Sequence, residues 1–291
     1  TSHPQVLTYK NDKSSKSWAA QPGQSINYVS CHDNLTFWDK LAISNADDSE
    51  ETRIQMNKLG SAIILTSQGV PFFQAGEEML RSKPSATVEG GFDENSYTSP
   101  DSTNSIKWAE KANVIDTYEY YKGLIAFRKA HSALRMTTAA DIQNNLTFMS
   151  GLEANVIGYT IAHNANGDTA EKITVIFNGG KNAVNVALPA GIWEICVNDK
   201  TAGTASLGTA QGTVSVPGIS AMVLVQGDDT IAKVETKTEG ETDVSVNTES
   251  AQPSGNTENV EKSSGNTPLI IGGVVAAAVA AAGVFVKKRR K

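Results

Sequence analysis

The chain has 291 residues, of which 40% are hydrophobic and 19% charged, and its formal net charge at pH 7 is −6. These fractions are typical of a globular protein. The last five residues are all basic, so the rest of the chain is more acidic than the total suggests, which argues against nucleic acid as a partner.

The first predicted strand covers residues 26–31 and ends at His32 and Asp33. Residues 1–25 are polar and have almost no apolar periodicity, so we expect a loop that leads into this strand. Because no other strand precedes it, the sheet to which it belongs is expected to begin upstream of the chain. A histidine beside a carboxylate, where a buried strand reaches the surface, indicates a site for sugar or phosphate chemistry.

Helices and strands alternate in the next part of the chain. A helix is predicted near 49–67, because acidic residues open its first turn and apolar residues recur at helical spacing. A short apolar and aromatic strand follows near 70–75, then an irregular stretch at 79–113 and a second helix near 114–130. This order predicts a parallel α/β unit.

The hydrophobic period changes to two between residues 137 and 226. Turn sequences such as Asn-Gly-Asp, Asn-Gly-Gly, Pro-Ala-Gly and Pro-Gly-Ile separate short β-type runs. The runs are 146–149, 156–162, 172–178, 185–188, 193–197, 212–216 and 221–225. They predict an antiparallel β-sandwich.

The C-terminal part has the composition of a linker and a membrane anchor. Residues 227–267 are rich in Thr, Glu, Ser, Gly and Asn, so they are predicted to be disordered. The uncharged apolar run 269–286 would be about 27 Å long as a helix, close to the ~30 Å hydrocarbon core of a bilayer. A buried Ala-rich core helix is the alternative, but the position of the run behind a polar linker favours a transmembrane helix.

The basic residues 287–291 predict the orientation of this anchor. By the positive-inside rule they lie in the cytoplasm, and the rest of the chain lies on the extracellular face of a bacterial membrane. No LPxTG-type pentapeptide precedes the apolar run, so membrane retention is favoured over covalent attachment to the cell wall.

Three segments of the chain, 27–41, 69–83 and 95–108, resemble consecutive blocks of the type I pullulanases. These are α-1,6-debranching enzymes of the α-amylase superfamily, glycoside hydrolase family 13. The resemblance implies that the chain begins in the C-terminal part of a (β/α)8 TIM barrel, at about strands 7 and 8. The predicted domains are 1–136 (barrel portion), 137–226 (β-sandwich), 227–267 (linker) and 268–291 (transmembrane helix with its basic tail).

The resemblance also assigns roles at the end of the seventh barrel strand. Asp33 would stabilise the transition state of a retaining glycoside hydrolase, and His32 would hydrogen-bond the same sugar. The nucleophile and the general acid/base of such an enzyme belong to strands upstream of this chain. Glu77 and Glu78 follow the eighth strand and are expected to shape the structure and the subsites.

Further contacts to a glucan substrate are implied for side chains of two loops, with packing as the alternative for each. These side chains are Arg81, Lys83, Asn95, Tyr97 and Trp38, with Phe37 as a second member of an aromatic platform. The two cysteines, Cys31 and Cys196, are expected to be free thiols, because they lie far apart and lack metal-binding spacing. Cys31 stands where relatives have a small or polar residue.

The predicted partners are therefore a branched α-glucan, such as pullulan, branched dextrins or glycogen, and a membrane through residues 269–286. No cofactor and no metal are expected, and any calcium site would depend on loops upstream, as would linkage preference. We expect that the isolated polypeptide neither folds its barrel portion stably nor hydrolyses substrate. Alternatives are an isoamylase, an α-1,4-acting enzyme, or a non-catalytic surface protein that binds glucan.

Overall fold

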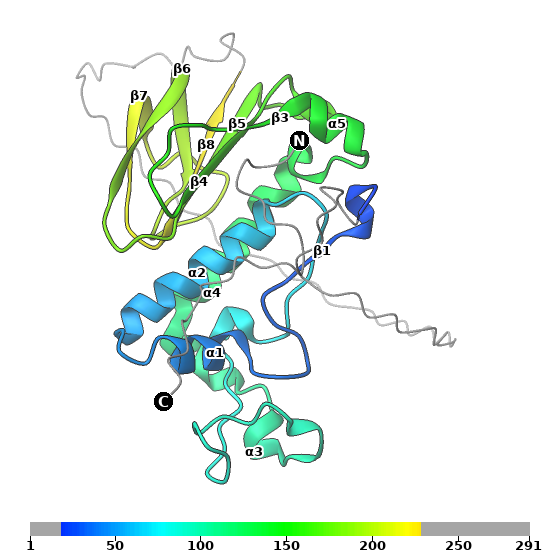
Figure 1. Ribbon diagram of the computed structural model, residues 1–291, viewed down its shortest axis with the longest axis vertical. Helices are drawn as coiled ribbons and strands as arrows, with labels where there is room; N and C mark the ends of the chain where they lie inside the picture. The colour runs from blue at the N-terminus through cyan, green and yellow to red at the C-terminus, as the bar shows by residue number, and fades with distance from the viewer. Residues whose placement is uncertain (1–18, 228–291) are drawn as a thin grey trace, which may run out of the picture. The chain divides into compact units, whose positions relative to one another are not determined.

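The computed structural model describes residues 19–227, in which a helical part is followed by an antiparallel sheet (Figure 1). The helices are α1 (Phe37–Ser44), α2 (Glu50–Thr66), α3 (Asp101–Asn104), α4 (Ile115–Ala130) and α5 (Ala139–Asn145). The strands are β1 (Ile26–Asn27), β2 (Val70–Pro71), β3 (Leu146–Phe148), β4 (Val156–Ile161), β5 (Lys172–Asn178), β6 (Val184–Val197), β7 (Thr209–Val216) and β8 (Ser220–Gln226).

The strands β1 and β2 pair in parallel, with Ile26 opposite Val70 and Asn27 opposite Pro71. The parallel arrangement predicted from the sequence is thus confirmed for these two strands. Both are shorter than the predicted 26–31 and 70–75, and within residues 19–227 each pairs only with the other. The loops that follow them contain His32 and Asp33 after β1, and Glu77 after β2.

The other six strands form one antiparallel sheet in the order β3-β4-β5-β8-β6-β7. The antiparallel pairing was predicted correctly, but the predicted division into a two-sheet sandwich was wrong. β8 pairs with β5 on one side and with β6 on the other, which joins all six strands into a single hydrogen-bonded sheet.

The predicted turn at residues 189–191 was also wrong, because these residues lie inside the long strand β6. The register of β6 against β7 shifts between Ala187 and Ile192, and Gly191 has a φ of +116°. The Pro-Ala-Gly sequence therefore forms a β-bulge, which merges two predicted runs into one strand.

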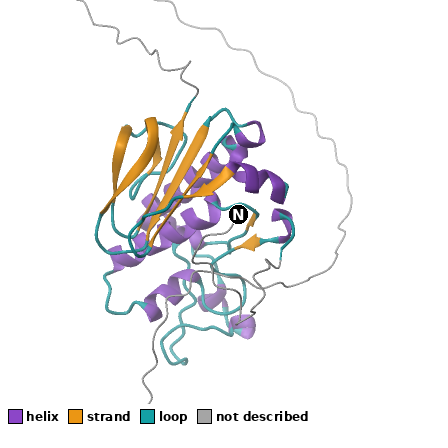
Figure 2. Cartoon of the chain, turned by 45° about the horizontal axis from the view of Figure 1, so that its top comes forward, coloured by secondary structure: helices purple, strands orange, loops and turns teal. Residues whose placement is uncertain are grey.

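The helices α2 and α4 lie side by side and pack against one face of this sheet (Figures 1 and 2). Leu65 of α2 and Phe127 of α4 belong to the same buried cluster as Ile173 and Val223 of the sheet. The Tyr159 hydroxyl of β4 donates to the Thr66 carbonyl oxygen at the end of α2, at 3.0 Å. Residues of the helical part and of the sheet thus belong to one hydrophobic core, and the predicted domain boundary at 136/137 stays a prediction.

The second cluster lies on strands β4 to β8 and contains Trp193, which is fully buried. The Trp193 indole N–H donates to the Pro189 carbonyl oxygen at 2.9 Å, so its polar atom has a partner inside the bulged strand. The central strands β5 and β8 are buried on both faces, whereas in β7 only the alternating residues Val214 and Val216 are buried, so the period of two is a property of the outer strand.

Arg128 of α4 fixes the end of α2. Its guanidinium group, on a side chain that is only 6% exposed, donates to the carbonyl oxygens of Leu65, Ser67 and Gly69 at 3.0, 2.8 and 2.9 Å. The last carbonyl groups of a helix lack partners within the helix and attract a cation. Arg128 therefore closes α2 and sets the start of β2 at the same time.

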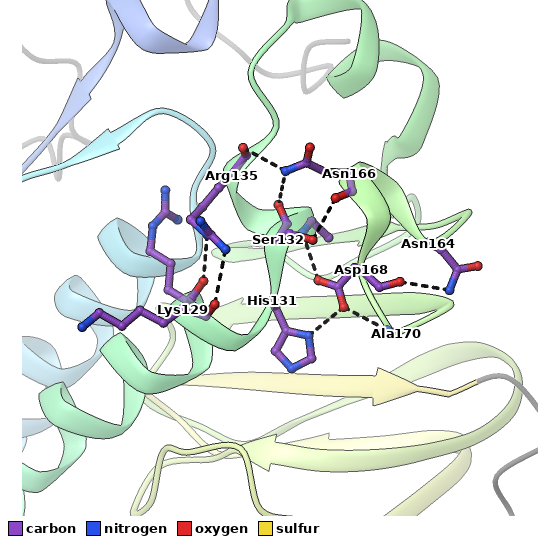
Figure 3. Close-up of polar contacts among 10 residues, drawn as sticks. Lys129, His131, Ser132, Arg135, Asn164, Asn166, Asp168 and Ala170 are labelled. Atoms are coloured by element: carbon purple, nitrogen blue, oxygen red, sulfur yellow. Dashed lines mark hydrogen bonds and ion pairs between the residues drawn. The ribbon is translucent and has the colours of Figure 1, made fainter.

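A polar junction joins the end of α4 to the loop between β4 and β5 (Figure 3). Asp168 lies 3.0 Å from the ring nitrogen Nδ1 of His131 and accepts the backbone N–H groups of Ala133 and Ala170, each at 2.9 Å. Burial alone would raise the pKa of the Asp168 carboxyl group, but these hydrogen bonds outweigh burial and hold it below its ordinary value.

Several predictions concern residues outside the range 19–227. The disordered linker falls almost entirely there, and the transmembrane helix at 269–286 lies wholly outside the described residues. Within residues 19–227, no helix is both long and apolar enough to cross a bilayer. Cys31 and Cys196 are free thiols, as predicted.

Candidate functional site

The candidate site begins with the bend that follows β1. His32 and Asp33 are exposed there, and neither side chain has a hydrogen-bond partner among the described residues. The next residue, Asn34, has a φ of +68° and accepts the Leu35 backbone N–H on its own side-chain oxygen at 2.7 Å. Asparagine tolerates this left-handed conformation better than most residues. The backbone, rather than the side chains of His32 and Asp33, therefore defines the bend.

The loop that follows β2 holds this bend through Lys83, whose side chain is 1% exposed. The Lys83 ammonium group donates to the carbonyl oxygen of Asn34. Burial, together with the neighbouring Arg81, lowers the pKa of Lys83, while the carboxylates of Asp39, Asp93 and Asp33 act in the opposite direction. The glucan contact predicted for Lys83 stays a prediction; among the described residues its ammonium group has an internal partner next to Asp33.

Asp39 of α1 connects the same two loops. It is fully buried, and its carboxylate accepts the Ser82 hydroxyl at 2.5 Å and the Lys83 backbone N–H at 2.8 Å. Its own backbone N–H donates to Thr36, the residue that caps α1, at 3.1 Å. A buried carboxylate is stable only with such partners. The start of α1 is therefore fastened to the loop after β2.

Glu77 makes a second connection between the two loops, closer to the strands. The Ser30 hydroxyl and the Gln74 backbone N–H both donate to its Oε1 atom, the latter at 3.0 Å. Burial raises the pKa of Glu77 to about 7, because desolvation outweighs the two hydrogen bonds. Glu78 accepts the Gly76 backbone N–H at 3.0 Å, so both carboxylates bind the backbone of their own loop.

The pKa of Glu77 predicts a pH-dependent stability. Protonation of Glu77 stabilises the fold fully below pH ~4.5, and this contribution is lost as the pH rises through about 7. In urea unfolding, the free energy of the wild type relative to Glu77→Gln should therefore fall by roughly 3 kcal/mol between pH 4.5 and pH 8. Ser30→Ala removes the hydrogen bond from the Ser30 hydroxyl, which lowers the pKa of Glu77. The stability contribution of protonated Glu77 should then be lost at a higher pH. Parallel curves for the wild type and Glu77→Gln would contradict the prediction.

The irregular loop 79–113 is ordered by its own backbone contacts. Arg81 donates to the carbonyl oxygens of Ala75 at 3.2 Å and of Asn104 at 2.5 Å. Asn104 in turn donates to the carbonyl oxygens of Ser96 and Ser99 at 2.6 and 3.0 Å. This part of the loop therefore has a defined shape without a strand or a long helix.

Two of the predicted glucan contacts lie on the outer surface of this loop. Asn95 is exposed, and its backbone N–H donates to Asp93 at 2.9 Å. Tyr97 is 83% exposed and lies in the short 3-10 helix Ser96–Thr98. Both side chains are free to meet a ligand from solvent.

Trp38 and Arg81 line one cavity of about 280 Å³ between α1 and the loop 79–113. The Trp38 ring also faces the Arg53 guanidinium group at 5.9 Å. The neighbouring Phe37 ring packs over Gly60 of α2, where a Cβ atom would come within 2.6 Å of it. The structure thus separates the two members of the predicted aromatic platform.

The candidate site consists of an exposed carboxylate and an exposed imidazole on a bend whose backbone is held by the Lys83 ammonium group. Within residues 19–227, no group of three or more His, Cys, Asp or Glu side chains is arranged to hold a metal ion. A retaining glycosidase needs two further carboxylates, a nucleophile and an acid/base. Of the two glutamates in the loop after β2, Glu77 is buried and Glu78 is half-buried.

Sequence reasoning missed Asp39 and Ser30 as members of the site. Asp39 follows Thr36 by three residues, the spacing of a helix N-terminus, and this signal was available. Its second role, as the acceptor for Lys83, joins residues 44 positions apart and has no local signal.

Comparisons with known proteins agree with this geometry. Residues 142–201 match the family described as the pullulanase all-beta domain. A pullulanase from Bacillus subtilis (strain 168) is 34% identical over 209 residues, which cover 72% of this chain and 28% of the relative. An isoamylase from Flavobacterium sp is 27% identical over 256 residues, which cover 72% of this chain and 31% of the relative.

Solved structures of pullulanases are also similar to this chain. The pullulanase from Bacillus acidopullulyticus has a TM-score of 0.67 and 42% identity, covering 71% of this chain and 25% of that one. A pullulanase from Anoxybacillus sp. LM18-11, complexed with maltotetraose, has a TM-score of 0.64 and 34% identity, covering 72% of this chain and 28% of that one. The chain therefore spans about a quarter to a third of the length of these relatives.

Proposed function

Because this chain is related to pullulanases and contains their all-beta domain, we propose that it forms the C-terminal part of a debranching glycoside hydrolase. The enzyme would cleave α-1,6-glucosidic bonds of pullulan, starch-derived branched dextrins or glycogen. In this proposal β1 and β2 are strands 7 and 8 of a (β/α)8 barrel whose other strands lie upstream. The parallel pairing of β1 with β2 supports this assignment.

The observation that supports the proposal most directly is the exposed His32–Asp33 bend after a strand of a parallel pair. Active sites of such barrels lie at the C-terminal ends of the strands. Asp33 would bind the sugar at the cleaved bond and stabilise the positive charge that develops on it, while His32 would hydrogen-bond the same sugar. The nucleophile and the acid/base would come from the upstream strands.

The loop 79–113 would border the glucan chain. Tyr97 and Asn95 are exposed and are proposed to stack on a sugar ring and to hydrogen-bond its hydroxyl groups. Trp38 and Arg81, which share a cavity, are proposed as a further contact region. The maltotetraose complex of the Anoxybacillus relative supports glucan as the ligand class.

The location of the protein is proposed from the sequence of residues 269–291. An apolar run of transmembrane length, followed by five basic residues, supports a single-pass anchor with the enzyme on the extracellular face of a bacterial membrane. Protease treatment of intact cells should then release a fragment that contains Asp33 and leave the basic tail in the membrane fraction. A protein recovered wholly in the soluble fraction would contradict this location.

Hydrolysis of pullulan tests the proposed activity. The complete protein should release reducing ends from pullulan and not from linear amylose, whereas the 291-residue chain alone should release none from either. An isoamylase is the second candidate, favoured by the relative from Flavobacterium sp. Hydrolysis of amylose, hydrolysis by the chain alone, or binding of pullulan without hydrolysis would each overturn the proposal.

A further inference from the structure

The position of Asp33 depends on residues that have no assigned part in the reaction. Although the Asp33 carbonyl oxygen accepts the Cys31 thiol at 3.8 Å, the side chains of Asp33 and His32 form no hydrogen bonds with the described residues, so they do not fix the bend. Its best-defined anchor is the carbonyl oxygen of Asn34, immediately after Asp33, which accepts the Lys83 ammonium group. Movement of that carbonyl group would turn the Asn34–Leu35 peptide plane, one residue after Asp33, and shift the bend that presents the Asp33 carboxylate.

Lys83 is itself held in place by Asp39. The Asp39 carboxylate receives the Lys83 backbone N–H at 2.8 Å and the Ser82 hydroxyl at 2.5 Å, and Asp39 is fully buried. The backbone of Lys83 also accepts the Asp93 N–H at 2.8 Å, so the loop 79–113 is fixed on both sides of this residue. The path from Asp39 through Lys83 to Asn34 therefore consists of direct hydrogen bonds.

A buried ammonium group is a costly way to fill space, because the charge loses its hydration. An apolar side chain would pack the same volume without that cost, whereas a charge-assisted hydrogen bond to a carbonyl group is short and directional. This geometry suits a group that must hold a backbone segment within a fraction of an ångström.

We propose that Lys83 and Asp39 are positioning residues, which hold the bend after β1 so that the Asp33 carboxylate meets the reacting sugar. This inference rests on the proposed function of Asp33. It assigns Lys83 a role through Asn34 in place of direct contact with glucan. Because Lys83 and Asp39 act on the transition state through Asp33, replacing either residue lowers kcat and leaves KM for pullulan nearly unchanged.

The test compares variants in the complete enzyme with pullulan as substrate. Lys83→Met should lower kcat about 30-fold, since a displacement of about 1 Å can cost about 100-fold in rate. Lys83→Arg keeps a cationic donor and should remain within about threefold of the wild type. Asp39→Asn should lower kcat about tenfold. The matched control is Lys40→Met on the exposed face of α1, which should leave kcat unchanged.

A double variant separates positioning from general damage to the fold. If Lys83 acts through Asp33, then adding Lys83→Met to Asp33→Asn should cause less than about a threefold further loss, because the group being positioned is already absent. If the double variant loses kcat by the product of the two single-variant losses, the inference is overturned. An unchanged kcat in Lys83→Met would also overturn it. If Lys83→Met does not fold, Ser82→Ala serves instead and should lower kcat about threefold; an unchanged kcat there would also overturn it. A wild-type enzyme inactive on pullulan would instead refute the proposed function.

Discussion

Replacement of Asp33 by asparagine in the complete enzyme should lower kcat for pullulan by about 1000-fold while KM changes by less than about threefold. The carboxylate of Asp33 is proposed to stabilise charge that exists only in the transition state, and hydrogen bonds of this kind supply several kcal/mol in glycosidases. Asparagine has nearly the same shape but lacks the charge. The measurement is steady-state hydrolysis of pullulan, together with thermal unfolding to show that the fold is unchanged.

The control for this variant is Asp47→Asn, which changes an exposed carboxylate beyond the end of α1 and should leave kcat unaltered. The exposed position of Asp33 makes the two substitutions comparable in their effect on stability. Equal activity of Asp33→Asn and the wild type would show that this bend is not the reacting centre. A raised KM with an unchanged kcat would assign Asp33 to ground-state binding only.

Replacement of Arg128 by methionine should lower the free energy of unfolding by at least about 3 kcal/mol. The substitution leaves the carbonyl oxygens of Leu65, Ser67 and Gly69 without their donor in a buried region. It also removes the positive charge at the C-terminal end of α2. Because the same contacts fix the residue before β2, we expect the loss to spread to the β1–β2 pair. Urea unfolding followed by circular dichroism measures the loss.

Arg135→Met is the matched control, since Arg135 also donates to two backbone carbonyl oxygens, those of Arg128 and Lys129, at 3.2 and 3.3 Å. Arg135 is exposed, so water can replace its hydrogen bonds, and its removal should cost less than about 1 kcal/mol. A loss for Arg128→Met as small as that for Arg135→Met would mean that the charge and the hydrogen bonds of Arg128 contribute little to stability.

The two long helices were predicted accurately because their signals are local, whereas the shorter helices α1, α3 and α5 were not predicted. The predicted helix near 49–67 is α2, Glu50–Thr66, and the predicted helix near 114–130 is α4, Ile115–Ala130. Ser49 caps α2 and accepts the Thr52 N–H, within one turn of the chain. A cap and an apolar face are properties of neighbouring residues, so the sequence suffices to place them.

The sheet was predicted less accurately, because bulges and pairing depend on distant strands. The Pro-Ala-Gly sequence at 189–191 has turn residues, yet it lies within β6, where Gly191 takes a positive φ. Nothing local distinguishes a bulge from a turn here. The number of sheets depends on β8, which pairs with both β5 and β6 and so joins the six strands into a single sheet.

The sequence by itself identified the two long helices, most strands of the antiparallel sheet and the His32–Asp33 pair, because each follows from residue types at short spacing. The tertiary structure decided which side chains face solvent and which hold the site. Lys83, predicted to contact glucan, is buried against Asn34, while Tyr97 is exposed. The reason is that burial and hydrogen bonding at Lys83 depend on Asn34, 49 positions away, and on Asp39, 44 positions away. Such partners meet only when the chain has folded.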